Sequence, residues 1–251
     1  VPLFYHSGRN IALTEYGVAL QEALTPVLKT LHQIPNQLQH LAQERETTIR
    51  LNVLAASTLV TQALISYKKD HDGLNFQLFQ NSQCEDADIT VFTRENFQIP
   101  AGNKDRYELF KERIFLAVPA DSPYASEESV RLKDFAHQDF ISLSGSRSIR
   151  TICDRYCMQA GFVPHIIYES DSPDTVKNLI ASGLGVGFWP HYTWSTDSME
   201  QIRLMPIAEP TCQRAIILQL HRHARVQEAV CSFYAFLNRY LRQLKAAEKT
   251  G

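Results

Sequence analysis

The sequence contains no run of about 18 apolar residues, the shortest stretch expected of a membrane-spanning helix. We therefore expect no transmembrane segment and no membrane partner. The N-terminus does not have the pattern of a signal peptide. It begins Val1-Pro2-Leu3-Phe4 without an initiator methionine, so we expect the chain to derive from a longer protein.

A basic excess is also missing, because 25 Lys and Arg residues stand against 27 Asp and Glu residues, giving a formal net charge of -2. A module that binds nucleic acid by itself usually carries a net positive charge. Any DNA-binding part must therefore be small, local or outside this chain.

Cysteine is scarce and scattered, with five residues at positions that suggest no disulfide framework. This usage is typical of a reducing cytoplasm, where we expect the protein to act. Cys153 and Cys157 lie four residues apart, but no nearby Cys or His completes a zinc-type spacing. His221 and His223 flank Arg222 and are a weak metal signal. We expect no metal and no other cofactor.

Motifs of catalysis are absent, since the sequence has no Gly-x-Ser-x-Gly elbow, no P-loop and no His-Glu-x-x-His. Asp171 and Asp174 are three residues apart, but an aspartate in a first helical turn normally compensates the helix dipole. We expect no catalytic residues and no enzyme activity. An enzyme on an α/β scaffold remains a rival hypothesis, because fold does not determine function.

Residues 1–13 have the pattern of a short β-hairpin, because the turn cluster Ser7-Gly8-Arg9-Asn10 separates two apolar flanks. Thr14 is then a predicted N-cap. A helical pattern follows, whose apolar residues recur at near-heptad spacing and form a seam. Such a seam is typical of a helix that packs against its own copy. The seam residues are Tyr16, Leu20, Leu24, Val27, Leu31, Ile34, Leu38 and Leu41. Pro26 and Pro35 predict a kinked or interrupted helix, ending near residues 44–47.

The rest of the chain alternates between strand and helix patterns, which predicts a parallel α/β sheet. The expected strands are 49–55, 75–79, 88–92, 114–118, 140–143, 166–168, 186–189, 202–206 and 215–220. The expected helices cover about 57–67, 149–159, 172–183 and 227–244.

Three stretches carry a resemblance to a known family. Residues 1–17, VPLFYHSGRNIALTEYG, resemble the end of a winged helix-turn-helix and the start of the linker helix in LysR-type transcription regulators. Residues 164–190, with ESDSPDT and ASGLGVG, resemble the second effector subdomain of that family. Residues 106–119 look like the strand that crosses into it.

The resemblance implies an α/β fold, a two-lobed periplasmic-binding-protein-like effector domain of type 2. Residues 1–46 would be the remnant of the winged helix-turn-helix and the dimerising linker helix. Residues 47–118 plus 193–251 would form effector subdomain I, and 119–192 effector subdomain II. Crossing segments near Val118 and Trp189 would act as hinges.

Two departures from the family pattern matter. The helix-turn-helix itself is not in the sequence, so we expect an N-terminally truncated form in which only wing and linker remain. In addition, only residues 80–87 stand where the family has a full helix between strands two and three of the first lobe. We therefore expect an abbreviated lobe and an altered cleft wall.

The resemblance also implies a function. It predicts a DNA-binding regulator, homodimeric or homotetrameric, that binds promoter DNA and senses a small metabolite in the cleft between its lobes. The residues at the predicted helix starts favour an anionic metabolite. Two alternatives stay open at this point. The chain could be a stand-alone solute-binding protein of the same fold, or a dimerisation fragment that does not bind DNA by itself.

The effector is expected where helices begin at the carboxyl ends of strands, because unpaired N–H groups and the positive dipole end point there. Hydroxyls, backbone donors and a nearby arginine suit a carboxylate. The candidate effector-binding residues are Ser57, Thr58, Thr93, Ser144, Ser146, Arg147 and Ser172. Ser and Thr at helix starts are often only caps, so capping alone remains open for Ser57, Thr58, Ser146 and Ser172. Arg147 could instead be a solvated residue of the first helical turn.

Arg9 lies in the tight turn of the hairpin, from which an arginine can reach DNA phosphate or the minor groove. His6 and Asn10 are further candidates for DNA contact. The alternative is a turn whose polar side chains are simply exposed to solvent.

Gly183, Gly185 and Gly187 suggest a dinucleotide fingerprint only at first sight. They follow a helix and precede a strand, the reverse of the order that pyrophosphate binding requires. We therefore predict a helix stop and a tight loop. Phe188 and Trp189 are predicted to pack in the core or the hinge, with stacking against a ligand as the alternative.

Overall fold

The computed structural model describes residues 1–7, 10–80, 84–95, 98–99, 104–145, 148–194 and 200–247. The chain divides into two compact units, Val1–Thr48 and Ile49–Gly251. No helix among the described residues is long and apolar enough to cross a membrane. In the same residues, no group of three or more His, Cys, Asp or Glu side chains is placed to hold a metal ion.

The first unit is the predicted hairpin followed by one helix. Strands β1 (Phe4–Ser7) and β2 (Asn10–Leu13) pair antiparallel. Helix α1 spans Glu15–Thr47. Thr14 is its N-cap, as predicted: Oγ1 accepts from the N–H of Gly17 at 3.1 Å and donates to the carbonyl of Pro2 at 2.8 Å. This second bond ties the start of α1 to the hairpin.

Helix α1 runs through both prolines, so of the two predicted outcomes the interruption is wrong, and the kink stays a prediction. Each proline removes one backbone donor without ending the helix. The seam side chains described on α1 are all at least 41% exposed, namely Tyr16, Leu20, Leu24, Val27, Leu31, Ile34 and Leu38. Soluble proteins rarely leave so long a row of large apolar side chains exposed.

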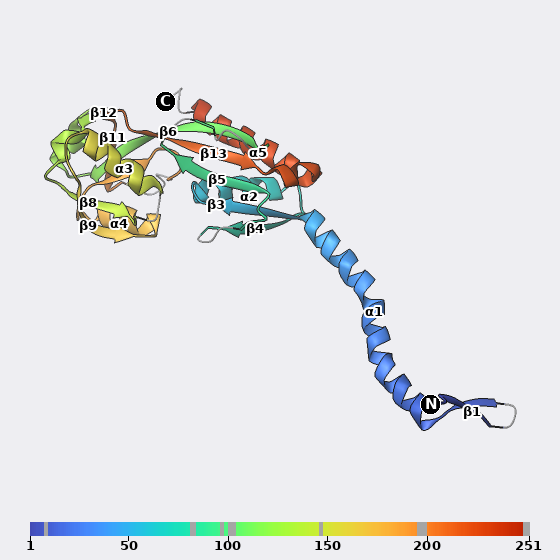
Figure 1. Cartoon of the computed structure of the whole chain (residues 1–251). Coiled ribbons are helices and arrows are strands. Elements are labelled where there is room, and N and C mark those ends of the chain that lie inside the picture. The colour runs from blue at the N-terminus through green and yellow to red at the C-terminus, as the bar shows by residue number, and fades with distance from the viewer. Residues whose placement is uncertain are drawn as a thin grey trace. The chain divides into compact units, whose positions relative to one another are not determined.

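The second unit is built on one mixed sheet with the strand order β10-β6-β13-β5-β3-β4 (Figure 1). Its strands are β3 (Thr48–Val53), β4 (Asn75–Phe79), β5 (Ile89–Arg94), β6 (Arg106–Pro119), β10 (Gly187–Pro190) and β13 (Gln213–Leu220). Strands β3 and β5 are parallel, as predicted, but β13 lies antiparallel to both β5 and β6. An all-parallel sheet is therefore wrong, because β13 returns from the far half and enters between these two strands.

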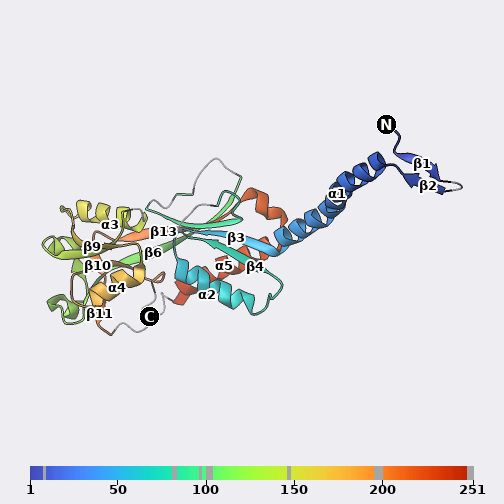
Figure 2. The ribbon, with the colours of Figure 1, turned by 90° about the horizontal axis from the view of Figure 1, so that it is seen from below.

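One hydrophobic core lies where helices α2 (Ser57–Lys68) and α5 (Glu228–Ala247) pack against this sheet. The two helices lie side by side (Figure 2). Tyr67 joins them, because its ring contacts Phe233 at 5.0 Å between centroids and its hydroxyl donates to Oγ of Ser232 at 2.9 Å. In the shortened segment 80–87, the described residues 80 and 84–87 contain no helix, as expected.

A second core forms the other half of the unit. Its parallel strands β8 (Asp139–Leu143) and β9 (His165–Ser170) are accompanied by helices α3 (Ser148–Gln159) and α4 (Pro173–Ala181). Strand β11 (Ile202–Met205) pairs with β6, and β12 (Ile207–Glu209) pairs with β7 (Val130–Arg131). Short 3-10 helices cover Pro123–Ser126, Leu132–Phe135 and Arg222–Val226.

Strand β6 belongs to both halves. Its first part pairs with β13 and its second part with β10 and β11. Phe110 is buried in the core of the first half and Ile114 in that of the second. Residues 110–114 are therefore where this strand passes from one half to the other.

Gly183 ends helix α4 with a φ of 76°, in agreement with the predicted helix stop. At Gly185 a Cβ would lie 2.6 Å from the carbonyl oxygen of Asp139. The loop is tight because β8 runs directly beside it, and no phosphate site is needed to explain its glycines.

Candidate functional site

A cavity of about 380 Å³ opens between the two halves of the second unit. Cavities of roughly 300–1,000 Å³ are typical of small-molecule sites. The residues that line it come from both halves and are Leu54, Ala55, Ala56, Ser57, Thr58, Gln80, Thr93, Leu143, Ser148, Ile149, Asp171, Ser172, Pro173, Asp174, Thr193, Trp194 and Arg214. Three helices begin at its wall, α2 at Ser57, α3 at Ser148 and α4 at Pro173.

Ser57 and Thr58 line the cavity, but neither caps α2. The N-cap is Ala56 in the left-handed conformation, with a φ of 57° and no side-chain hydrogen bond. Capping by Ser57 is therefore wrong. The N–H groups of Leu54 and Ala55, just before the cap, both bond to the carbonyl of Val91 on β5. Ser57 and Thr58 lie in the first turn of α2, at the cavity wall.

Ser172 is the N-cap of α4, as predicted, and its hydroxyl accepts from the N–H of Thr175 at 3.4 Å. It also lines the cavity, together with Asp171 and Asp174 on the same segment. Asp174 pairs with Nζ of Lys177 at 3.2 Å. This wall of the cavity therefore combines hydroxyl and carboxylate groups.

Thr93 lines the cavity from the end of β5 and is 8% exposed. Ser144 is not among the lining residues, and its N–H donates to the carbonyl of Ser170 at 2.9 Å. Ser146 and Arg147 lie outside the described residues. Four of the seven predicted residues are thus brought together.

Arg214, Thr193 and Trp194 also line the cavity, and sequence reasoning missed all three. Arg214 is 4% exposed at the start of β13, and Glu112 opposite it on β6 is 0% exposed. Buried arginine and glutamate are rarely found without a partner. Arg214 is the one charged residue of β13, and this was the available signal for such a pair.

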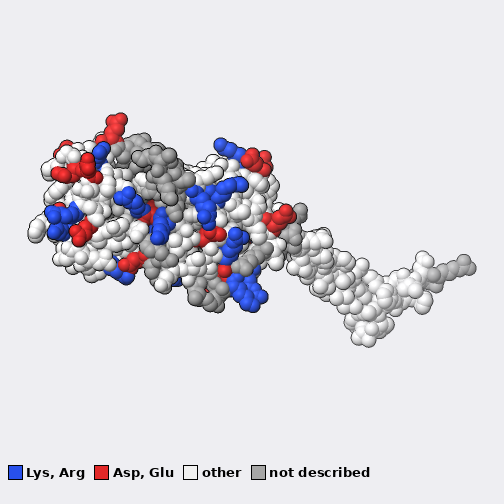
Figure 3. All heavy atoms as spheres, turned by 90° about the horizontal axis from the view of Figure 1, so that it is seen from above, with Lys and Arg blue, Asp and Glu red and all other residues white. Residues whose placement is uncertain are grey.

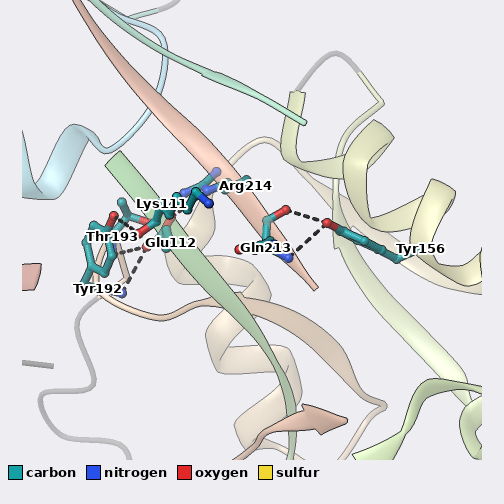
Figure 4. A network of polar contacts seen from close by, with 7 residues as sticks. All are labelled: Lys111, Glu112, Tyr156, Tyr192, Thr193, Gln213 and Arg214. Carbon is teal, nitrogen blue, oxygen red and sulfur yellow. Dashed lines mark hydrogen bonds and ion pairs between the residues drawn. The ribbon is translucent and has the colours of Figure 1, made fainter. Parts of the chain in front are cut away.

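Glu112 and Arg214 form the centre of a polar network at the crossing point (Figure 4). Oε2 of Glu112 accepts from Nε of Arg214 at 2.7 Å. Oε1 accepts from the backbone N–H groups of Tyr192 at 3.0 Å and Thr193 at 2.7 Å. Nη2 of Arg214 donates to Oγ1 of Thr193 at 2.6 Å. The network joins β6, β13 and the segment that follows β10.

The chain has only two tryptophans, Trp189 and Trp194, and they meet beside the cavity. Their rings lie edge to face with centroids 5.3 Å apart. Nζ of Lys177 lies 5.5 Å and 5.8 Å from the two ring centroids, within the range of a cation–π interaction. Trp189 is fully buried, as predicted for a core residue, whereas Trp194 lines the cavity.

Three cysteines lie buried in the second half, Cys153, Cys157 and Cys212. Burial raises the pKa of Cys157 and of Cys212 to about 12, and it raises that of Cys153 well above the ordinary value. The thiolate is the reactive form of cysteine. At neutral pH these thiols stay protonated and act as small core residues.

The weak metal signal at His221 and His223 has a packing explanation. The two rings stack at 5.7 Å, and Nε2 of His221 hydrogen-bonds Oγ1 of Thr90 at 2.8 Å. Burial lowers the pKa of His221 below its ordinary value of 6.5, which favours the neutral ring.

The predicted DNA contacts lie in the first unit. His6 is in β1 opposite Ile11, and Asn10 begins β2 opposite Ser7. Both side chains are exposed, and Arg9 lies outside the described residues. The face of residues 49–251 seen in Figure 3 carries acidic and basic side chains intermixed, without a broad basic area.

Comparison with known proteins identifies the chain. A family model, the LysR substrate binding domain, matches residues 42–242. The chain is 24% identical over 257 residues to the transcriptional dual regulator GltC of Bacillus subtilis, covering 98% of this chain and 84% of that protein. It is 27% identical over 224 residues to the uncharacterized HTH-type transcriptional regulator YybE of the same species, covering 86% and 76%.

Solved structures show the same fold. The effector binding domain of QuiR in complex with shikimate matches with a TM-score of 0.63 and 18% identity, covering 78% of this chain and 97% of that one. HinK, a LysR family transcriptional regulator from Pseudomonas aeruginosa, matches with a TM-score of 0.63 and 16% identity, covering 92% and 81%. The resemblance and the two-lobed α/β fold predicted from the sequence are confirmed. The chain belongs to the LysR family of transcription regulators, and the cavity lies within its substrate-binding domain.

Proposed function

We propose that a small anionic metabolite binds in the cavity between the two halves and so regulates transcription from a promoter to which the protein binds. The observation that carries this proposal is the cavity itself, which is lined from both halves by helix starts, hydroxyl groups and one buried arginine. An occupant that touches both halves stabilises their closed arrangement, and this is how binding at one site changes a distant one.

The proposed contacts to the metabolite are Ser57, Thr58, Thr93 and Ser172, whose side chains line the cavity. Ser144, Ser146 and Arg147 stay predictions. The helix starts add backbone N–H groups and their positive dipole ends, which favour an anion. The matched relatives are transcription regulators, and we propose no enzymatic reaction for this chain.

The test of this proposal is a screen by thermal shift with anionic, neutral and cationic metabolites. We expect a subset to raise the melting temperature and to change the tryptophan emission, because Trp194 lines the cavity. Ser57→Ala should weaken the affinity of such a metabolite by roughly 10- to 100-fold if the serine hydroxyl bonds a charged group. Ser182→Ala is the matched control, since this hydroxyl bonds the carbonyl of Asn178 at the end of α4. No response to any metabolite would contradict the proposal.

We further propose that the protein acts in the cytoplasm as a homodimer or homotetramer held by the apolar seam of α1. Contacts of His6, Arg9 and Asn10 with promoter DNA belong to the same proposal. Seven described seam side chains are exposed over the length of a 33-residue helix. Covering them removes a large apolar surface from water, which is the main favourable term in association.

Leu31→Glu should therefore dissociate the oligomer, because it places a charge in the middle of the seam, 55% exposed in the single chain. The measurement is the molar mass by light scattering over a range of protein concentrations. Lys29→Glu, on the same helix but off the seam, is expected to leave the mass unchanged. Equal masses for the wild type and Leu31→Glu would show that the seam is not the interface.

A further inference from the structure

Arg214 is the one cationic residue among the described residues that line the cavity. Its side chain is more than nine-tenths buried, and it extends from β13 at the point where the chain passes between the halves. A buried charge costs free energy unless it is paired and hydrogen-bonded.

Two of the three nitrogen atoms of Arg214 have partners, Nε on Glu112 and Nη2 on Thr193. Within the part of the chain that the structure describes, Nη1 makes no hydrogen bond, and the residue borders the cavity. Both carboxylate oxygens of Glu112 are already occupied by Arg214 and by two backbone N–H groups. Glu112 thus holds the guanidinium through Nε (Figure 4), and the side chain that carries the remaining Nη1 lines the cavity.

We propose that Arg214 recognises a carboxylate of the effector and that Glu112 is the residue that positions it. This inference rests on the proposed function of the cavity. Arginine matches a carboxylate because its planar donors form short, charge-assisted hydrogen bonds. A guanidinium that is already fixed loses little freedom when the ligand arrives.

The opposite wall carries two carboxylates, Asp171 and Asp174, on the segment that starts α4. Both side chains are exposed and Asp174 pairs with Lys177, so solvent screens their repulsion of a second negative charge. The effector class is therefore a carboxylate, with a monocarboxylate favoured modestly over a dicarboxylate.

The site also explains how binding can reach both halves. Arg214 bonds Thr193 and Glu112, which belong to two different segments that cross between the halves. A ligand on Nη1 that also contacts Ser57 of the first half and Ser172 of the second would link all of them. Such a ligand favours one arrangement of the halves over another.

The test is a fluorescence titration of the whole chain, whose two tryptophans both lie at this site. The probes form one series of nearly equal shape, succinamide, succinamate and succinate, with benzamide and benzoate as an aromatic pair. Succinamate and benzoate should quench saturably, succinate more weakly, and the two amides not at all. Arg214→Lys should weaken succinamate binding about tenfold or more, because one point charge replaces the planar donors.

Glu112→Gln separates a positioning role from a merely structural one. Gln keeps an acceptor for the two backbone N–H groups, but its amide NH2 cannot accept from Nε of Arg214. The guanidinium loses the bond that positions it, so binding of succinamate should become several-fold weaker while the fold is kept. Arg131→Met is the control, since Arg131 pairs with Asp134 on the surface and should leave the titration unchanged. If Arg214→Lys does not fold, the double variant Glu112→Gln/Arg214→Met is used instead. We expect it to have a native circular dichroism spectrum and to show no quenching by succinamate or benzoate.

Equal quenching by amides and carboxylates overturns the role of Arg214, as does an unchanged affinity in Arg214→Lys. In that case a metabolite whose binding is weakened by Ser57→Ala would still support the proposed function of the cavity. No quenching by any probe also overturns the role of Arg214. If no metabolite shifts the melting temperature either, the proposed function fails with it.

Discussion

Replacing Arg214 by methionine is expected to lower the free energy of unfolding by about 3–5 kcal/mol. Glu112 is 0% exposed, and the variant would leave its carboxylate buried without a charged partner. For a domain of about 200 residues this corresponds to a fall of the melting temperature of roughly 6–20 °C. The measurement is urea unfolding at neutral pH, followed by circular dichroism.

The double variant Glu112→Gln/Arg214→Met should recover most of this loss. It removes both charges, and replacing a buried ion pair as a unit is often neutral. The two single changes and the double change form a cycle that isolates the coupling between the residues. A loss for Arg214→Met below about 1 kcal/mol would mean that water reaches Glu112 and solvates it.

The same network that stabilises the crossing point also presents Arg214 to the cavity. Stability and recognition therefore depend on one set of contacts. Glu112 lies on β6 between Phe110 of one core and Ile114 of the other, so its hydrogen bonds hold the strand where it changes halves. A ligand that binds Arg214 therefore also affects β6 through Glu112.

Much of the fold could be predicted because its signals are local. The hairpin, the Thr14 cap, the Ser172 cap and most strands follow from turn residues and from apolar spacing within a few positions. Strand β6 was predicted in this way only over residues 114–118. The helix seam of α1 could be read in the same way. Its continuity through Pro26 and Pro35 could not, because sequence alone does not say whether a missing backbone bond will end a helix or only weaken it.

The site could be predicted only in part, because some of its contacts join residues far apart in the chain. Arg214 and Glu112 are separated by 102 residues, and their pairing depends on the register of β13 against β6. The start of α2 depends similarly on β5, since Leu54 and Ala55 bond Val91 there. Thr93 and Ser172 were found because each follows or begins an element on the cavity side.

Trp189→Ala is the second change with a large expected effect, a loss of about 3–5 kcal/mol in the free energy of unfolding. Trp189 is fully buried on β10 and packs against Trp194 and Lys177. Its Nε1 also donates to the carbonyl of Trp194 at 3.3 Å. Truncation leaves a void in the core and an unsatisfied carbonyl at the edge of the cavity.

Urea unfolding followed by circular dichroism measures this loss without using tryptophan emission. The control is Met158→Ala on α3, because Met158 is 57% exposed and its loss should stay within about 0.5 kcal/mol. Trp189→Phe should lie between the two, since it keeps a ring beside Lys177 but loses the hydrogen bond to Trp194. An alanine variant as stable as the control would contradict this prediction. It would show that the second half repacks around the void, so that the contacts of Trp189 contribute little to stability.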